Sequence, residues 1–170
     1  MAQKELVLRE GAAEVLIRGG EQTLKEGGGD VFYNPAQVFN RDLSVLVLSV
    51  FAKLRAAELA KHRGRLARIS RGEAGQAEAT QPGLLILEAL AATGVRSIRY
   101  AKELGEAVRG IVANDLDKAA AEQIGSNARR SGVPEGFIKV TCCDAAGHMY
   151  SHRASGPGGM GYRAYDVIDV

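Results

Sequence analysis

The hydrophobic positions of the chain predict one long helix in its first half and an alternating pattern of short elements in its second half. From Leu43 onward, apolar side chains recur every three or four residues, which predicts an amphipathic helix over about 42–61. Asn40 or Asp42 is expected to cap the free amides at its start. A short strand is expected before it, over 12–17.

The second half of the chain alternates short apolar runs with helical periodicity. Strands are predicted over 84–88, 110–115, 137–141 and 165–170, and helices over 95–104 and 116–131. Strands that alternate with helices imply right-handed crossovers and a parallel sheet that binds its ligand at the carboxyl ends of the strands. The sequence therefore predicts an α/β fold.

Composition and charge divide the chain further. We expect an N-terminal extension with its helix over 1–60, a basic, flexible insertion over 61–82, and a sheet domain over 83–170. The length of 170 residues and the 46% hydrophobic content fit one globular protein. The net charge of +2 alone does not indicate nucleic acid, but seven Lys or Arg residues lie between Lys53 and Arg71 against one acid, and this cluster could contact phosphates.

The cysteines and histidines show no arrangement typical of a redox or metal site. Cys142 and Cys143 are adjacent, which excludes a disulfide framework and favours a reducing compartment. The first ten residues lack the apolar core of a signal peptide. The apolar segment 43–51 is too short to span a bilayer, so no membrane partner is expected. The histidines fit no catalytic triad or metal-ligand spacing and are expected to be solvated: His62, His148 and His152.

Acidic residues follow three of the predicted strands: Glu88, Asp115 and Asp144. At the carboxyl edge of a parallel sheet, carboxylates can bind the hydroxyls, amino groups and base of a nucleoside-like cofactor. Asp115 also lies 21 residues after Gly94, near the interval of about 20 at which dinucleotide-binding folds place the acid that binds ribose.

Each of these residues also has a purely structural interpretation. Asp115 could cap the helix that begins at residue 116, and Asp144 could be a turn residue. Glu88 could pair with a nearby cation such as Arg96. Arg96 itself could bind a cofactor carboxylate or form an ordinary surface salt bridge.

The turn after the first of these strands, in "EALAATGVRSIR", contains a single glycine, Gly94. A pyrophosphate needs backbone amides at very close range and hence several glycines, which disfavours an NAD-dependent oxidoreductase. A cofactor without phosphates can lie against alanines, and S-adenosylmethionine fits that description.

Four segments in order, "VFYNPAQVFNRDLSV", "LEALAATGVRSIRYA", "VANDLDKAA" and "DVIDV", resemble the tRNA (guanine-26-N2)-dimethyltransferase family of class I methyltransferases. The resemblance covers nearly all of the chain except 61–82 and a glycine-rich patch at 155–161. It implies a Rossmann-like class I methyltransferase fold, incomplete here, with the first four strands of the sheet and an N-terminal extension.

The resemblance also implies a site for S-adenosylmethionine. Arg41 of Asn-Arg-Asp and Arg96 of Ala-Thr-Gly-Val-Arg would reach the cofactor. Asp115 would hold its ribose, and Asp144 with Ala145 would line its adenine.

Glu88 stands where the family commonly has an aspartate, so it keeps the charge on a longer side chain. The family transfers two methyl groups to the exocyclic N2 of guanine 26, which makes tRNA the expected partner and an intracellular compartment, the nucleus, cytoplasm or mitochondrion, the expected location. The family's Asp-Pro-aromatic-Gly turn would begin just after Val170, so no catalytic residue is expected in this chain, which we expect to be a fragment that is inactive alone. The alternative is a non-catalytic RNA- or protein-binding module in which the basic cluster binds and the sheet is scaffold.

Overall fold

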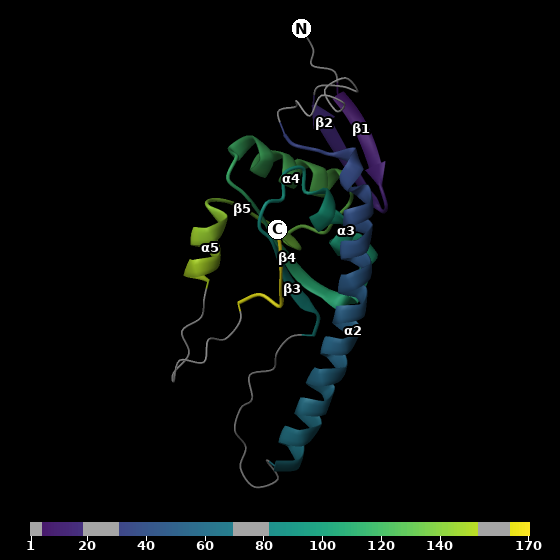
Figure 1. Cartoon of the computed structure of the whole chain (residues 1–170), viewed down its shortest axis with the longest axis vertical. Helices are drawn as coiled ribbons and strands as arrows, with labels where there is room; N and C mark the ends of the chain where they lie inside the picture. The colour runs from purple at the N-terminus through teal and green to yellow at the C-terminus, as the bar shows by residue number, and fades with distance from the viewer. Residues whose placement is uncertain (1–4, 19–30, 70–81, 153–163) are drawn as a thin grey trace.

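The computed structural model describes residues 5–18, 31–69, 82–152 and 164–170 (Figure 1). Its central element is a sheet of β3 (Leu84–Glu88), β4 (Val108–Asp115), β5 (Ile138–Cys142) and β6 (Val167–Asp169), in the order β5-β4-β3-β6. Every neighbouring pair is parallel, so the carboxyl ends of the four strands lie along one edge. The parallel α/β arrangement predicted from the sequence is confirmed.

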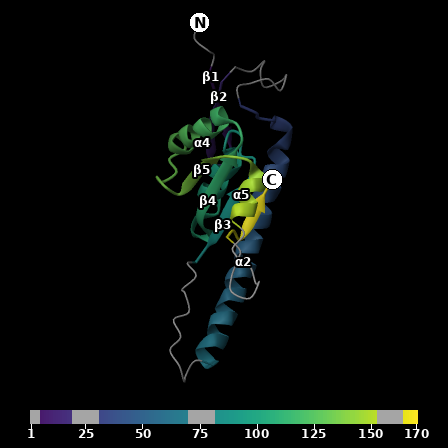
Figure 2. The same ribbon diagram turned by 90° about the vertical axis from the view of Figure 1, so that its left-hand side faces the viewer.

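Helices cover both faces of this sheet. They are α2 (Val38–Ile69), α3 (Val95–Glu103), α4 (Lys118–Arg130) and α5 (Ala145–Ser151), with short 3-10 turns η1 (Pro35–Gln37) and η2 (Gly105–Ala107). Successive strand residues point to opposite faces, so Ile86 packs with residues of α2 and α3 while its neighbour Leu87 packs with α5. Figure 2 shows α5 in front of the strands with α2 running behind them.

The N-terminal residues form an antiparallel hairpin of β1 (Glu5–Glu10) and β2 (Ala13–Arg18). Val15 and Ile17 of β2 are buried in one cluster with residues of α3 and α4. Asn127 of α4 ties the hairpin down, because its Oδ1 accepts a hydrogen bond from Leu16 N at 2.8 Å and its Nδ2 donates to Thr93 O at 2.9 Å. The hairpin therefore belongs to the folded unit.

The long helix differs from its prediction at both ends. It begins at Val38, so Asn40 and Asp42 lie inside it and do not cap it, while Asn34 caps the preceding turn η1 through Ala36 N at 2.9 Å. It continues to Ile69 because Ala, Leu, Lys and Arg, which favour helix, dominate its second half. The predicted boundary at residue 61 thus falls within α2, and residues 70–81 of the predicted insertion lie outside the described part. In the described ranges, no helix combines the length and apolarity that a membrane span requires.

Two elements were missed in the sequence. Strand β1 pairs with β2 along its whole length, and the alternation of "ELVLRE" is its signal. Helix α5 is only seven residues long and contains Gly147, so it offers too few positions for a helical period to be read. The glycine-rich patch at 155–161 lies outside the described residues.

Candidate functional site

A pocket of about 200 Å³ lies at the carboxyl end of β3. Its wall is formed by residues within 32–41, by the loop from β3 to α3, and by Val170 after β6. Three of the predicted site residues line it together: Arg41, Glu88 and Arg96. Residues that are far apart in the sequence thus meet at the edge where a parallel sheet binds its ligand.

Glu88 is the last residue of β3 and is only 5% exposed. Its Oε2 accepts a hydrogen bond from Ser97 N at 2.9 Å and a second, short one from the Ser97 hydroxyl, so it satisfies one backbone amide in the first turn of α3. Burial raises the pKa of Glu88 to about 7; the Ser97 hydroxyl and Arg96 oppose the rise and the Asp169 carboxylate adds to it. Glu88 therefore titrates near neutral pH inside the pocket wall.

Arg96 is held by a carboxylate that was not predicted as a site residue. Its Nη1 donates to Asp169 Oδ1 at 2.6 Å, and the buried Tyr100 hydroxyl donates a short hydrogen bond to the other oxygen of Asp169. The parallel pairing of β3 and β6 places Asp169 directly beside Glu88. Arg96 thus pairs with Asp169 and not with Glu88, and the signal available in the sequence was the penultimate acid of "YDVIDV".

Arg41 is 6% exposed and is surrounded by groups that fix its guanidinium. Its Nε donates to Glu10 Oε1 at 2.7 Å and its Nη2 to Glu10 Oε2 at 2.6 Å. Nη2 also donates to Asn34 O at 3.2 Å, and the guanidinium carbon lies 5.0 Å from the centre of the Tyr33 ring. Two residues of the Tyr-Asn-Pro segment, which is part of the family resemblance, thus contact and position this arginine.

The loop between β3 and α3 contains two residues with positive φ but only one glycine. A carboxylate stabilises the other position. Gly94 has φ +75° and Ala92, which is not a glycine, has φ +46°. Asp115 Oδ2 accepts a hydrogen bond from Ala92 N at 2.8 Å and so stabilises that uncommon backbone. The cap of α4 is Asp117, which accepts from Ala119 N at 2.9 Å, so the interpretation of Asp115 as that cap is wrong.

Asn114 is a fully buried residue that the sequence analysis missed. Its Nδ2 donates to Ala89 O at 3.1 Å and to Cys143 O at 2.9 Å, and its Oδ1 accepts from the Thr141 hydroxyl at 2.8 Å. One side chain therefore joins the carboxyl ends of β3, β4 and β5. Its position next to Asp115 in "Asn-Asp" was the only signal.

Asp144 and Ala145 lie further along the same edge, after β5, and do not line the pocket. Asp144 is exposed and its Oδ2 accepts from Gly147 N at 2.6 Å, so it caps α5 and is not merely a turn residue. Ala145 packs against the cluster of Leu87 and Val112. The six predicted residues therefore divide into Arg41, Glu88 and Arg96 at the pocket and the other three along the edge.

Of the two histidines at α5, His152 at its C-terminal cap is exposed as predicted, whereas His148 is not solvated. His148 is buried, its ring stacks on that of His152 with centroids 4.1 Å apart, and its Nε2 lies 2.8 Å from the Tyr165 hydroxyl. Burial, with the nearby charges of His152 and Lys139, lowers the pKa of His148. The pair packs α5 against the segment before β6, while the side chain of His62 lies outside the described residues.

A larger cavity, of about 560 Å³, lies at the opposite end of the sheet. It is bounded by α2, by η2 and by the first residues of β3 and β4. None of the predicted site residues lines it, and the amino ends of parallel strands are not where α/β sheets bind their ligands. We therefore assign the candidate site to the smaller pocket.

Comparison with known proteins agrees with the motifs. The profile of a family described as N2,N2-dimethylguanosine tRNA methyltransferase matches residues 11–170, which is nearly the whole chain. The chain belongs to this family. All six predicted site residues lie within the matched region of the N2,N2-dimethylguanosine tRNA methyltransferase family, whereas Glu10 lies just before it.

The chain matches only part of the length of curated members of the family. The chain is 40% identical over 161 residues to the tRNA (guanine(26)-N(2))-dimethyltransferase of Drosophila melanogaster, covering 86% of this chain and 26% of that protein. It is 34% identical to the mitochondrial one of Saccharomyces cerevisiae, covering 96% and 30%. The one from Sulfurisphaera tokodaii is 32% identical, covering 86% and 32%. The chain thus spans about a quarter to a third of these relatives.

Solved structures support the fold. Trm1 from Pyrococcus horikoshii, in complex with S-adenosyl-L-methionine, superposes with a TM-score of 0.57 at 22% identity, over 87% of this chain and 33% of that one. An S-adenosylmethionine-dependent methyltransferase from Agrobacterium tumefaciens gives 0.60 at 15% identity, over 99% and 39%. The methyltransferase fold predicted from the motifs is confirmed for this member of the family.

Proposed function

We propose that the chain is the cofactor-binding part of a tRNA (guanine-26-N2)-dimethyltransferase, and that its pocket takes the methionine end of S-adenosylmethionine. The observation that carries this proposal is the convergence of Arg41, Arg96 and Glu88 on one pocket. Two guanidinium groups suit a carboxylate, and a carboxylate suits an ammonium, so the three side chains match the two charged groups of a free amino acid.

The size of the pocket supports binding of only one end of the cofactor there. Pockets that enclose whole small molecules measure roughly 300–1,000 Å³, and this one measures about 200 Å³. The remainder would lie on the open edge, with its ribose held by Asp115 and its adenine beside Asp144 and Ala145. The alanine-rich loop suits a ligand without phosphates, because only Gly94 is needed for the turn.

The chemistry would be two methyl transfers to the N2 amine of a guanine. When bound, the cofactor supplies a methyl group on a sulfonium; a bond from N2 to carbon forms, the carbon–sulfur bond breaks, and N2 loses a proton. The residues of this chain would orient the donor, because Arg41 and Arg96 are themselves fixed by Glu10 and Asp169.

The group that aligns the guanine amine is expected in the Asp-Pro-aromatic turn of the family, after Val170. This position is supported by Val170, the residue after β6, which lines the pocket. The substrate would be tRNA, as the names of the relatives state for those proteins. We accordingly propose an intracellular location, and one relative is named as mitochondrial.

The proposal is tested by calorimetric titration of S-adenosylmethionine into the 170-residue chain. We expect saturable binding by the wild type, a loss of at least tenfold in affinity in Asp115→Ala, and near-normal binding in Asp117→Ala. Asp117→Ala is a matched control because it removes a carboxylate two residues away that only caps α4. Methyl transfer to tRNA is not expected from this chain alone.

Other results would point elsewhere. A folded chain that binds tRNA but not S-adenosylmethionine would be the non-catalytic binding module. If NAD competed with S-adenosylmethionine for the site, the result would favour an NAD-dependent oxidoreductase. Methylation of tRNA by the purified 170-residue chain would show that the catalytic group lies within it.

A further inference from the structure

We propose that Glu10 of the N-terminal hairpin is a positioning residue for the pocket, acting through Arg41. It would fix the plane and direction of the Arg41 guanidinium and thereby set the affinity for the carboxylate of the bound amino acid. This inference rests on the proposed function. It brings into the site Glu10, the last residue of β1, which lies just before the region that matches the family.

The burial and bonding of Glu10 are those of a structural anchor. The residue is 5% exposed, and its two oxygens accept four hydrogen bonds. Two come from Arg41, one comes from the Tyr33 hydroxyl at 2.9 Å, and one comes from Arg99 Nη1 at 3.0 Å. Burial alone would raise the pKa of Glu10, but the hydrogen bonds and charges of its partners hold it below the ordinary value, so it is ionised at neutral pH.

The contacts leave one edge of the Arg41 guanidinium for a ligand. Nε and Nη2 donate hydrogen bonds to Glu10, and Nη2 also donates to Asn34 O. Among the described residues, Nη1 has no hydrogen-bond partner, and Arg41 lines the pocket. Because a two-point contact fixes the planar guanidinium in both direction and rotation, Glu10 decides where Nη1 points.

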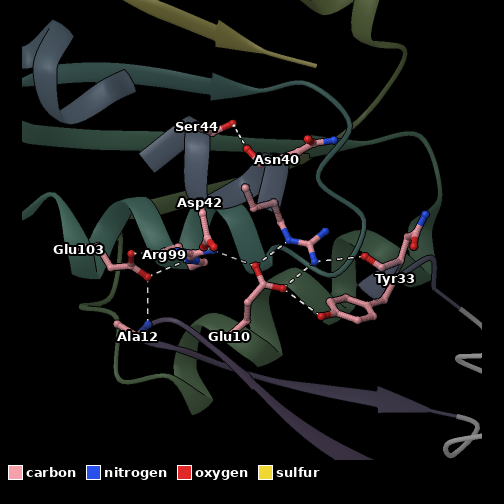
Figure 3. Close-up of polar contacts among 10 residues, drawn as sticks. Glu10, Ala12, Tyr33, Asn40, Asp42, Ser44, Arg99 and Glu103 are labelled. Carbon is pink, nitrogen blue, oxygen red and sulfur yellow. Dashed lines mark hydrogen bonds and ion pairs between the residues drawn. The ribbon is translucent and has the colours of Figure 1, made fainter. Parts of the chain in front are cut away.

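The neighbouring arginine does not depend on Glu10 in the same way. Arg99 donates to Glu103 at 2.8 and 3.2 Å and pairs with Asp42 at 2.7 Å, as Figure 3 shows. Arg41 has Glu10 as its one carboxylate partner in the described part of the chain. Removing the charge of Glu10 therefore leaves Arg99 paired and Arg41 without a counter-charge.

Two effects of this removal have opposite signs, which makes the proposal testable. A guanidinium that has lost its fixed partner turns more freely and binds an anion less well. If Glu10 only neutralised Arg41, removing it would raise the positive potential and strengthen anion binding. Since the guanidinium is buried and its orientation decides whether Nη1 reaches the pocket, we expect the first effect to dominate.

The experiment is titration of S-adenosylmethionine into the full chain and its Glu10→Gln variant, with circular dichroism to verify folding. Glu10→Gln should weaken binding at least tenfold. Glu103→Gln is the matched control, because it removes a carboxylate from Arg99 in the same network but does not contact Arg41; it should change the affinity less than twofold. A double-mutant cycle with Arg41→Lys should be strongly non-additive, which a general loss of stability would not produce.

Unchanged or tighter binding by Glu10→Gln would overturn the proposal, as would additive losses in the cycle. If Glu10→Gln does not fold, Glu10→Asp keeps the charge but shortens the reach by one methylene. It should bind at least threefold more weakly if position matters, and normal binding by this variant would overturn the proposal. Failure of the wild type itself to bind would instead contradict the proposed function.

Discussion

Glu88 is the residue whose charge state conflicts most with its surroundings. It is buried beside the carboxylate of Asp169, and burial raises its pKa to about 7. In the unfolded chain the group titrates near 4.5. The folded protein thus binds a proton that the unfolded chain has released between these two pH values, and folding is favoured at the acidic end of the interval.

The consequence is a pH-dependent stability that Glu88→Gln should remove. The contribution of Glu88 is fully present below pH 4.5 and is lost as the pH rises through 7, a change on the order of 3 kcal/mol in the free energy of unfolding. Relative to the wild type, Glu88→Gln should gain stability over this interval. Urea unfolding at several pH values measures the difference.

The matched control for this series is Glu122→Gln, which alters a solvent-exposed acid on α4. Its difference from the wild type should stay constant with pH. A constant difference for Glu88→Gln as well would mean that Glu88 titrates normally in the folded protein.

At the scale of elements, the loop from β3 to α3 shows how one glycine suffices for the turn. Gly94 lies against α4: a Cβ there would be 3.0 Å from Ile124 Cγ2 and 3.3 Å from Ile124 Cα. The loop thus needs both a positive φ and a missing side chain at this position, whereas at Ala92 the Asp115 carboxylate supports the backbone.

Replacing Gly94 should cost more than replacing a glycine that provides only the turn. Gly132 has φ +71° and open space around it, so Gly132→Ala should lose about 1–2 kcal/mol of stability from backbone strain alone. Gly94→Ala should lose about 2–4 kcal/mol, because overpacking against Ile124 adds to the strain. Chemical denaturation of the two variants compares them directly, and equal losses would refute the need for close packing here.

The elements that the sequence revealed are those with a strong local pattern. Strand β3 is a continuous apolar run, β5 alternates apolar and polar residues, and α3 and α4 show helical spacing, so the existence and order of these elements were predictable. The limits of α2 were not, because the capping residue Asn34 belongs to the turn η1 before it, and the second half of α2 follows propensity without an apolar period.

The site was predictable in its residue types but not in its partners. Acids after parallel strands must share an edge, which located Glu88, Asp115 and Asp144. The pairs of Arg41 with Glu10 and Arg96 with Asp169 join residues 31 and 73 positions apart, and no local pattern specifies contacts at such separations. Long-range ion pairs of this kind had to be seen in the structure.

At the scale of the whole molecule, α2 has apolar side chains on two sides. One side, with Leu48 and Ala52, is buried against the sheet domain. The other carries six residues that are 42–68% exposed and that fall within about 100° of the helix circumference at 100° per residue. They are Phe39, Leu43, Leu46, Val47, Val50 and Leu54.

This apolar stripe should promote self-association without contributing to folding. The double variant Leu46→Gln/Val50→Gln should unfold within about 0.5 kcal/mol of the wild type and should remain monomeric at higher concentration in sedimentation experiments. Leu48→Gln, on the buried side and only 7% exposed, is the control and should lose at least about 2 kcal/mol. A comparable loss in the double variant would show that the stripe is packed in the folded chain.

The hairpin also has a consequence for folding during synthesis on the ribosome. Glu10 is synthesised before its partner Arg99, which follows 89 positions later. At roughly 5–20 residues per second, that separation lasts roughly 4–18 s. Throughout this time Val15 and Ile17, whose partners lie in α3 and α4, have no core to enter. The apolar side chains of β2 therefore stay uncovered until α3 and α4 have been translated.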